Sequence, residues 1–399
     1  MQDATTQQAR LLERVDRVEP PSDLLAKLER GIPLRVKLGL DPTAPAVTLG
    51  WAVVLRKLRT FQDLGHTAVL IVGDFTARVG DPSGRSETRP RLTAAEVEGY
   101  TGAVLSQILS ILRPEPLEIR YNSEWLGDLD MGEALELTSK ATVAQMLERG
   151  DFAKRYEQGI PISVMEFLYP LLQGYDSVAV AADVELGGAD QLWNLMMGRV
   201  IQERYGMEPQ VAMTVPLLVG TDGSQKMSQS LGNYIGITEP ADEIFGKTMS
   251  IPDHLMESWY LLTTELEQDE VARIGTALRD GSLHPGGAKR RLAREIVSLY
   301  QGEDAARAAE ERFDVVHRLG AVPDDVSGYP LPDEDPIYLP GVLRDAGLVA
   351  SGGEGRRLIA QGAVRLTDPD EVLAQEHVER SLLEGRVLKV GKRRFVRLL

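Results

Sequence analysis

The stretch that decides the fold is LRVKLGLDPTAPAVTLGWAVVLRKLRTFQDLGHTAVLIV, residues 34–72. Residues 34–40 alternate enough between apolar and polar side chains to form a strand, which an Asp-Pro pair ends. Residues 50–63 repeat apolar side chains every three or four positions, as a helix with one buried face does. Residues 67–72 are apolar and rich in β-branched side chains, which is typical of a buried parallel strand. Strand, helix and strand with short links form a βαβ unit, so we predict an α/β fold with a doubly wound parallel sheet.

The rest of the chain extends this unit in both directions. From 92 to 197 the pattern predicts helices and one short strand near 117–120, and a further strand is expected at 213–219. Residues 239–319 have a mostly helical pattern, and prolines and acids gather over 322–340. The predicted organisation is a Rossmann-type domain at 1–235 with an inserted helical segment at about 120–185, a helical domain at 236–320, a Pro/Asp-rich linker at 321–340 and a small αβ module at 341–399.

Composition excludes several classes of protein. At 399 residues the chain is too long for one ordinary core. It has no cysteine, which excludes disulfide scaffolds, zinc–thiolate sites and a cysteine nucleophile. Its first residues are polar, without an apolar stretch of signal-peptide length, and no apolar run approaches the length needed to span a bilayer. We therefore expect a cytoplasmic protein without a membrane partner.

Charge is distributed unevenly along the chain. The formal net charge is -16, which alone argues against a nucleic-acid partner. The segment 376–399, however, contains seven Arg or Lys residues against three Glu residues. A partner responds to such a local patch more than to the net charge, so the last segment is a candidate nucleic-acid contact.

Seven segments in a fixed order resemble one family. They are KLGLDPTAP, VVLRKLRTFQDLGH, GDFTARVGDPSGRSETRP, RYNSEWL, LYPLLQGYDS, ELGGADQ and LGNYIG. Together they resemble the class I aminoacyl-tRNA synthetases, and in detail the bacterial tyrosine enzymes. The resemblance implies activation of L-tyrosine with ATP, transfer to tRNA(Tyr), and a homodimer. It also implies that 236–320 recognises the anticodon.

The predicted tyrosine pocket lies around one helix. Tyr169, Gln173 and Asp176 are spaced by four and three residues, which puts them on one helical face. By the resemblance, Asp176 accepts the substrate phenol hydroxyl, while Tyr169 and Gln173 hold the substrate ammonium group. Asp81 matches a family carboxylate near that ammonium, and Gln191 matches a side chain that polarises the substrate carboxylate. The alternative interpretation of the spacing is an amphipathic helix with an ordinary polar face.

Two charged residues near this pocket have less definite roles. Lys37 occupies the position where some relatives have a tyrosine that touches the substrate hydroxyl. Its side chain either lines the tyrosine pocket or faces away from it. Asp74, in GDFT, is placed near the site by the pattern and has no assigned role.

The predicted ATP site departs from the family pattern at its first signature. The family has His-x-Gly-His there, and this chain has Thr48-Leu49-Gly50-Trp51. Gly50 remains where the backbone approaches adenine, and the Thr48 hydroxyl can still donate a hydrogen bond, whereas Trp51 is bulky with one donor. Asp190 matches a group that binds the ribose. The predicted ATP-binding residues are Gly39, Asp41, Thr48, Gly50, Trp51, Gly188, Asp190, Lys226 and Met227.

The second signature, Lys-Met-Ser-Lys-Ser in the family, is KMSQS at residues 226–230. In the family this loop is mobile and closes over pyrophosphate, and Gln229 brings no charge there. Magnesium is expected to arrive with ATP, and no structural metal is expected. The predicted catalytic residues are Thr43, Thr48, Lys226 and Ser228. The alternative function is a diverged synthetase paralogue with weak or no activation, acting on a tyrosine analogue or as a tyrosine- or RNA-binding protein.

The C-terminal module resembles the small RNA-binding domain that these synthetases share with a ribosomal protein. Basic side chains in it are expected to contact RNA phosphates, independently of sequence and with strong salt dependence. The alternative is a solvated charged face. The predicted RNA-binding residues are Arg356, Arg357, Lys389, Lys392, Arg393 and Arg394.

Overall fold

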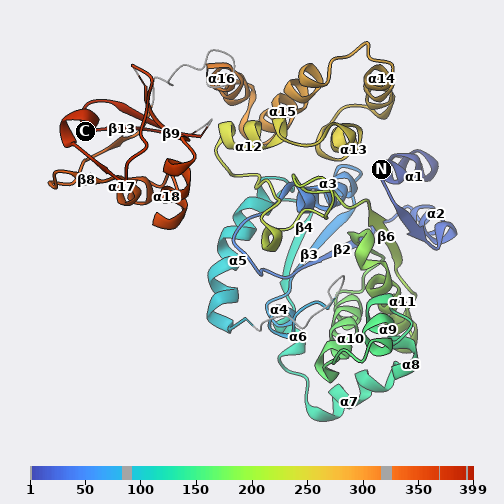
Figure 1. The fold of residues 1–399 in the computed structure, drawn as a ribbon. Helices are drawn as coiled ribbons and strands as arrows, with labels where there is room; N and C mark the ends of the chain where they lie inside the picture. Colours follow the sequence, from blue (N-terminus) through green and yellow to red (C-terminus); the bar gives the residue numbers. More distant parts are fainter. Residues whose placement is uncertain (1, 83–91, 316–325, 368, 392–393) are drawn as a thin grey trace. The chain divides into compact units, whose positions relative to one another are not determined.

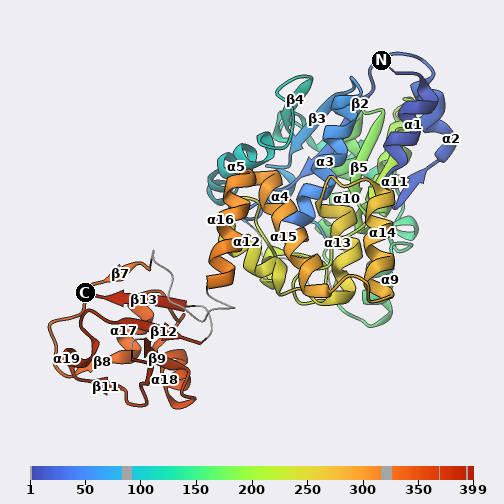
Figure 2. The same cartoon turned by 90° about the horizontal axis from the view of Figure 1, so that it is seen from above.

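The fold is described from a computed structural model. It describes residues 2–82, 92–315, 326–367, 369–391 and 394–399. The chain forms two compact units (Figures 1 and 2), one of residues 1–240 with 247–296 and the other of residues 241–246 with 297–399. The helical segment predicted at 236–320 is therefore divided between the two units instead of forming a compact unit of its own.

The first unit contains a six-stranded sheet. Its strand order is β1-β6-β5-β2-β3-β4, with β1 antiparallel to β6 and every other neighbouring pair parallel. This arrangement confirms the predicted doubly wound α/β fold. The strands are β1 (Arg17–Glu19), β2 (Arg35–Leu40), β3 (Thr67–Val72), β4 (Leu117–Tyr121), β5 (Val184–Gly188) and β6 (Val211–Val215).

The strand order reverses between β2 and β5. The chain continues from β2 to β3 and β4 on one side, whereas β5 and β6 lie on the other side. Because the connections diverge from this point, a crevice forms beyond the carboxyl ends of the two strands, where doubly wound sheets bind ligands. The residues that follow β2 and β5 are thus placed together by topology.

The predicted βαβ unit is observed, with α3 (Leu49–Asp63) between β2 and β3. One other strand prediction was wrong in its bounds, and two strands were not predicted. Strand β6 begins two residues earlier than expected and ends at Val215, so the irregular segment after it is longer. Strand β5 was missed, because VELGG has a charged residue and two glycines in place of an apolar alternation. The short β1 was missed as well.

Two helices beside the sheet cross closely because both carry glycine. Helices α10 (Val164–Ala179) and α11 (Leu192–Arg204) are neighbours, and α11 also contacts β5 and β6. A Cβ at Gly174 would lie 2.9 Å from Ile201 Cγ1 and 3.4 Å from Gly198 Cα. The remaining helices wholly within this unit are α1 (Ala4–Leu12), α2 (Pro21–Leu28), α4 (Thr76–Val79), α5 (Ala94–Leu109), α6 (Ser123–Leu126), α7 (Met131–Ser139), α8 (Val143–Met146), α9 (Gly150–Glu157), α13 (Met256–Thr263) and α14 (Gln268–Arg279).

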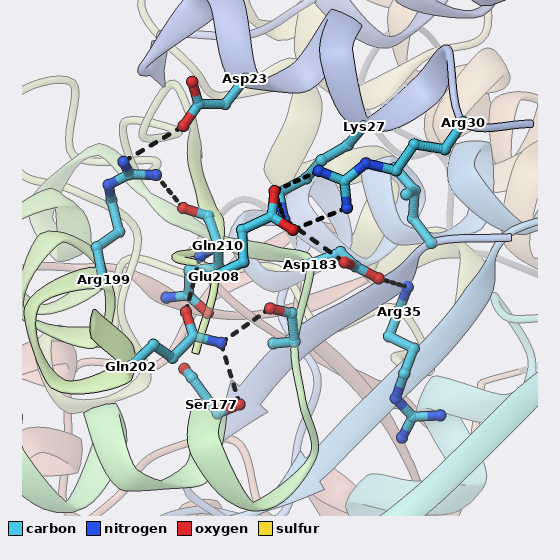
Figure 3. Close-up of polar contacts among 12 residues, drawn as sticks. Asp23, Lys27, Arg30, Arg35, Ser177, Asp183, Arg199, Gln202, Glu208 and Gln210 are labelled. Atoms are coloured by element: carbon cyan, nitrogen blue, oxygen red, sulfur yellow. Dashed lines mark hydrogen bonds and ion pairs between the residues drawn. The ribbon is translucent and has the colours of Figure 1, made fainter. Parts of the chain in front are cut away.

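A polar network ties α2 and α11 to the segments around β5 and β6 (Figure 3). The Lys27 ammonium is buried between the carboxylates of Asp183 and Glu208, at 3.5 and 3.2 Å. The Gln202 amide donates to the Ser177 carbonyl and accepts from the Gln210 backbone N–H at 2.7 Å. These bonds fix the backbones that carry the side chains of Ser177 and Gln210.

The second unit contains a C-terminal five-stranded sheet of order β10-β9-β12-β13-β7. Helices α17 (Leu339–Asp345) and α18 (Gly352–Ala360) pack together, and their apolar side chains join those of the sheet in one core. The other elements are α16 (Glu303–Asp314), β7 (Gly328–Tyr329), β8 (Ile337–Tyr338), β9 (Val364–Thr367), β10 (Glu371–Val372), β11 (His377–Val378), α19 (Arg380–Leu383), β12 (Val387–Val390) and β13 (Arg394–Leu398). Helices α12 (Ala241–Met249) and α15 (Pro285–Gln301) each contribute residues to both units.

The prediction of a linker at 321–340 is wrong for residues 328–338. Strand β7 pairs with β13 in parallel, and β8 pairs with β11. Residues 328–338 are therefore part of the C-terminal module, because backbone pairing outweighs their Pro-rich composition. Residues 321–325 lie outside the described residues. Among the residues that the structure describes, no helix is long and apolar enough to cross a membrane.

Replacing Gly174 by alanine should destabilise the protein. The added methyl group would overlap Ile201 at the α10–α11 crossing, and such overpacking costs about 1–3 kcal/mol. Gly99 is the matched control, because it lies within α5 and an added Cβ there would meet no atom within 4 Å. Gly99→Ala should be neutral or stabilising by about 0.5–1 kcal/mol. Urea unfolding followed by circular dichroism checks both, and equal stability of the two variants would contradict the close crossing.

Candidate tyrosine and nucleotide site

The carboxylate of Asp41 begins the site, directly after β2. It accepts hydrogen bonds from the Tyr169 hydroxyl at 2.9 Å and from the Thr76 hydroxyl at 2.7 Å. A Cβ at Gly73 would lie 2.0 Å from this carboxylate, so the approach of the two chain segments requires glycine. Asp41 was predicted on the ATP side, and the structure places it against the tyrosine-pocket residue Tyr169.

Helix α10 presents the three predicted pocket residues on one face. Its start is fixed by a capping box between Ser163 and Glu166. Tyr169 and Asp176 are buried, and Gln173 between them is partly buried. Seven residues correspond to about 10 Å along a helix. The face therefore has polar groups at two separated ends, which suits a ligand with polar groups on both sides of a ring.

Asp176 accepts hydrogen bonds from a side chain of α6 and from the residue that precedes this helix. The Trp125 indole N–H donates to it at 2.8 Å, and the Asn122 amide donates at 3.4 Å. Burial raises the pKa of Asp176 to about 7, although the Lys37 charge and these two hydrogen bonds act in the opposite direction. Asp74, which had no assigned role, accepts from the backbone N–H and hydroxyl of Ser123 at the start of α6. It thus orients the segment that holds Asp176.

Lys37 is fully buried beneath α10. Its ammonium donates to the Gln173 carbonyl at 2.9 Å and the Ser177 hydroxyl at 2.6 Å, and forms an ion pair with Glu185 at 2.9 Å. Because an ammonium has three N–H groups, these three partners use all of them. Lys37 therefore faces the pocket helix, but its donors are not available to a ligand hydroxyl.

The other end of the site is rich in carboxylates. The Gln191 amide donates to Asp81 at 3.0 Å, and Asn194 donates to the Gln191 oxygen at 3.0 Å. Burial first, and then the charges of Asp41 and Asp81, raise the pKa of the Tyr169 hydroxyl well above its ordinary value. This concentration of negative charge favours the cationic end of a ligand.

The Thr48-to-Trp51 segment forms the start of α3. The Thr48 hydroxyl accepts from the Trp51 backbone N–H at 3.3 Å, so the threonine caps the helix. A Cβ at Gly50 would lie 3.5 Å from Met227 Cβ, which brings the two signature segments together. Trp51 itself is partly exposed in the first turn of α3.

The second signature is organised by Asn233. This buried amide accepts from the Ser228 N–H at 2.8 Å and donates to the Lys226 carbonyl at 3.1 Å. The Lys226 ammonium forms an ion pair with Asp190, and the Gln229 amide donates to the Ala46 carbonyl. The loop is therefore connected to both the predicted ribose-binding acid and the segment before α3.

The remaining predicted nucleotide residues lie at the carboxyl ends of β2 and β5. Gly39 has open space where a Cβ would stand, whereas a Cβ at Gly188 would lie 2.8 Å from Asp190. The Thr43 N–H donates to the Asp41 carbonyl at 2.8 Å. Their contact with a nucleotide stays a prediction. Among the described residues, no cluster of His, Asp or Glu has the arrangement of a metal site.

Four residues of the site were not identified from the sequence. They lie inside quoted segments, but nothing in their spacing showed that they contact the pocket residues. A buried polar residue is found only when the fold shows what surrounds it. The four are Thr76, Asn122, Trp125 and Glu185.

The predicted RNA-binding residues have different surroundings in the C-terminal unit. Arg356 and Arg357 are exposed on α18, and Lys389 lies over the Phe395 ring. Arg394 instead donates to the Leu348 carbonyl and forms an ion pair with Glu354 at 3.5 Å, which ties β13 to α18. Lys392 and Arg393 lie outside the described residues.

Comparison with known proteins places this site in a family. The model of the "tRNA synthetases class I (W and Y)" matches residues 29–317. The chain belongs to this synthetase family. It is 52% identical to a tyrosine–tRNA ligase of Moorella thermoacetica, over 100% of this chain and 97% of that protein. It is 48% identical to a tyrosine–tRNA ligase of Desulfotalea psychrophila, over 98% of each. These findings confirm the resemblance that the seven segments indicated.

Solved structures support the synthetase fold independently. A tyrosyl-tRNA synthetase of Archaeoglobus fulgidus, complexed with L-tyrosine, has a TM-score of 0.64 at 22% identity and covers 77% of this chain and 100% of its own. A tryptophanyl-tRNA synthetase of Plasmodium falciparum has a TM-score of 0.56 at 15% identity, covering 73% of this chain and 80% of its own.

The raised pKa of Asp176 predicts that the ligand-free synthetase loses stability as pH rises through about 7. Between its ordinary value of 3.8 and about 7, the folded state holds a proton that the unfolded chain has released, so rising pH favours unfolding. The full effect is on the order of 4 kcal/mol. Urea unfolding from pH 5 to 8 should show this decline in the wild type and less of it in Asp176→Asn. Equal pH slopes for the two proteins would contradict a raised pKa.

Proposed function

We propose that this synthetase is a tyrosine–tRNA ligase, which activates L-tyrosine with ATP and transfers the tyrosyl group to tRNA(Tyr). The observation that carries the proposal is the face of α10, with an acidic ammonium site near Tyr169 at one end and buried Asp176 at the other. Identity of about half the residues to tyrosine–tRNA ligases over the whole chain supports the same assignment.

Asp176 would discriminate tyrosine from phenylalanine. Its carboxylate would accept the phenol hydroxyl, while the bonds from Trp125 and Asn122 hold it in place. Phenylalanine has no hydroxyl to donate to this buried acceptor, and the loss of such a hydrogen bond typically discriminates by roughly 10⁴–10⁵-fold. At the other end, the oxygens of Tyr169 and Gln173 and the carboxylate of Asp81 would hold the ammonium. Gln191 would polarise the substrate carboxylate.

The nucleotide would bind across the two signature segments. The tyrosine carboxylate attacks the α-phosphorus of ATP in line, giving tyrosyl-adenylate and pyrophosphate, without a covalent enzyme intermediate. Asp190 would accept the ribose hydroxyls, and Lys226 would leave Asp190 to reach the departing pyrophosphate. Magnesium would enter with ATP, and the hydroxyls of Thr43, Thr48 and Ser228 would supply further donors. Gly39, Gly50, Trp51, Gly188 and Met227 would surround the base and ribose.

A diverged synthetase with weak or no activation is the second candidate. The observation that favours it is the bond from the Gln229 amide to the Ala46 carbonyl. A side chain held in this way contributes no charge to departing pyrophosphate, and one missing donor typically costs about 3–4 kcal/mol of transition-state stabilisation. The altered Thr48-to-Trp51 segment adds to this argument. Such a protein would act on a tyrosine analogue or bind tyrosine or RNA.

The C-terminal module would bind tRNA(Tyr) through its exposed basic residues. Arg356 and Arg357 are exposed together on α18, and Lys389 lies over an aromatic ring, which suits contact with phosphates and a base. Arg394 would act indirectly, because its guanidinium already binds Leu348 and Glu354. Lys392 and Arg393 stay in the proposal on sequence grounds. The helices of 236–320 would recognise the anticodon.

A homodimer is proposed for the first unit, acting in the cytoplasm. Large apolar side chains of the segment from α7 to the start of α10 are strongly exposed, which supports a contact with a second copy in this region. Burying them against a second copy would remove this apolar surface from water. These side chains are Met131, Leu135, Val143, Tyr156 and Val164.

The proposed reaction is tested by ATP–pyrophosphate exchange with the full chain, magnesium and L-tyrosine. Tyrosine should support exchange and phenylalanine should not, because only tyrosine brings a hydroxyl group that can donate to Asp176. Asp176→Ala should abolish the preference. Gly99→Ala, on the exposed side of α5, is the control and should exchange as the wild type does.

Two results would decide between the candidates. Folded protein that binds tyrosine but shows no exchange would contradict the ligase and favour the diverged paralogue. Exchange at equal rates with tyrosine and phenylalanine would contradict the assignment of the pocket.

A further inference from the structure

The amide of Gln173 has an orientation fixed from behind the pocket. Its N–H group donates to Glu185 Oε1 at 3.0 Å. Among the described residues, no hydrogen bond uses its amide oxygen. Gln173 is partly buried, whereas Glu185 is 1% exposed on β5, so the amine side of the amide points inward to the sheet. The oxygen is left to meet a ligand.

An ionised carboxylate selects this orientation because it can only accept hydrogen bonds. If the Gln173 amide turned over, its oxygen would stand against a Glu185 oxygen and one charge-assisted hydrogen bond would be lost. The turned amide would also direct an N–H group towards the substrate ammonium. The Tyr169 hydroxyl behaves in the same way, since it donates to Asp41 and keeps its lone pairs for a donor.

The Glu185 carboxylate is surrounded by donor groups in the interior. Lys37 pairs with it at 2.9 Å from the adjacent strand, where the two residues are in register. The Ser177 hydroxyl donates at 3.3 Å, and the Gln210 amide donates to the same oxygen. A Cβ at Gly198 would lie 3.0 Å from that oxygen, so α11 closes the cluster. Each buried charge requires the other, because removing one would leave its partner buried without a compensating charge.

We propose that Glu185 is a positioning residue for tyrosine binding, held by Lys37, which turns the Gln173 amide oxygen towards the substrate ammonium. The inference rests on the proposed function, since it takes the ammonium of tyrosine as the ligand group at Gln173. It assigns the buried ion pair a part in substrate recognition and explains why a lysine stands under the pocket without touching the ligand.

The test removes both charges together, in Lys37→Met combined with Glu185→Gln. Replacing a buried pair by neutral side chains of similar volume is often tolerated, whereas a single substitution would leave one buried charge without a partner. Calorimetry would measure the Kd of L-tyrosine and of 3-(4-hydroxyphenyl)propionate, which lacks only the ammonium group. The variant should bind tyrosine roughly 10- to 100-fold more weakly, as expected for one hydrogen bond to a charged group. Its affinity for the propionate should stay near the wild-type value.

Two controls distinguish an effect on the orientation of the Gln173 amide from a general effect on the structure of the pocket. Arg155→Met with Glu166→Gln removes a buried ion pair between α9 and α10, at 2.6 Å, and should leave both affinities unchanged. In a Gln173→Ala background, the Lys37 and Glu185 changes should have no further effect on the ratio of the two Kd values, because no amide remains to be oriented.

Three results would overturn the inference, and one of them also rejects the proposed function. If the double variant bound both ligands as the wild type does, or bound both more weakly by the same factor, the ion pair would not act through the ammonium. A wild-type protein that does not prefer tyrosine over the propionate would reject the proposed function as well. The first two results leave that function standing.

Discussion

Charged groups can be buried beside a binding helix only when each finds a partner, and this constraint governs the centre of the first unit. Lys37 and Glu185 lie on adjacent strands beneath α10, paired with each other and surrounded by the amide and hydroxyl groups of Gln173, Ser177 and Gln210. Gly174 and Gly198 let α10 and α11 approach closely enough to close this cluster. The packing of the helices, the register of β2 with β5 and the orientation of the pocket residues therefore depend on one another.

The same arrangement decides what the pocket can bind. Carboxylates behind the site use the donors of Tyr169 and Gln173, so both side chains present oxygen to a ligand. Asp41 and Asp81 add negative charge at that end, and Asp176 supplies a buried acceptor at the other. A molecule with an ammonium group and a distant hydroxyl satisfies both ends. Tyrosine has this shape, and the family to which the chain belongs acts on tyrosine or tryptophan.

Much of this could be predicted from the sequence where local pattern determines structure. The apolar periodicity of residues 34–72 gave β2, α3 and β3, and the spacing of Tyr169, Gln173 and Asp176 put them on one helical face. Strand β5 was not predicted because Glu185 is a buried charge in a strand with two glycines. The pairing of Lys37 with Glu185 depends on strand register across 148 residues of chain, which no local pattern contains. The composition of residues 328–338 predicts a linker because their strands are completed only by β13 and β11, which lie far away in the sequence.

The most direct test of this account is a crystal structure of the full chain with L-tyrosine. It should show the phenol oxygen within hydrogen-bond distance of Asp176, and the ammonium nitrogen bound by the oxygens of Tyr169 and Gln173. The Lys37–Glu185 pair should remain closed beneath it. Tyrosine bound in the reverse direction, or a ligand carboxylate held by the Gln173 amide nitrogen, would contradict the claim that buried carboxylates prepare this pocket for an ammonium group.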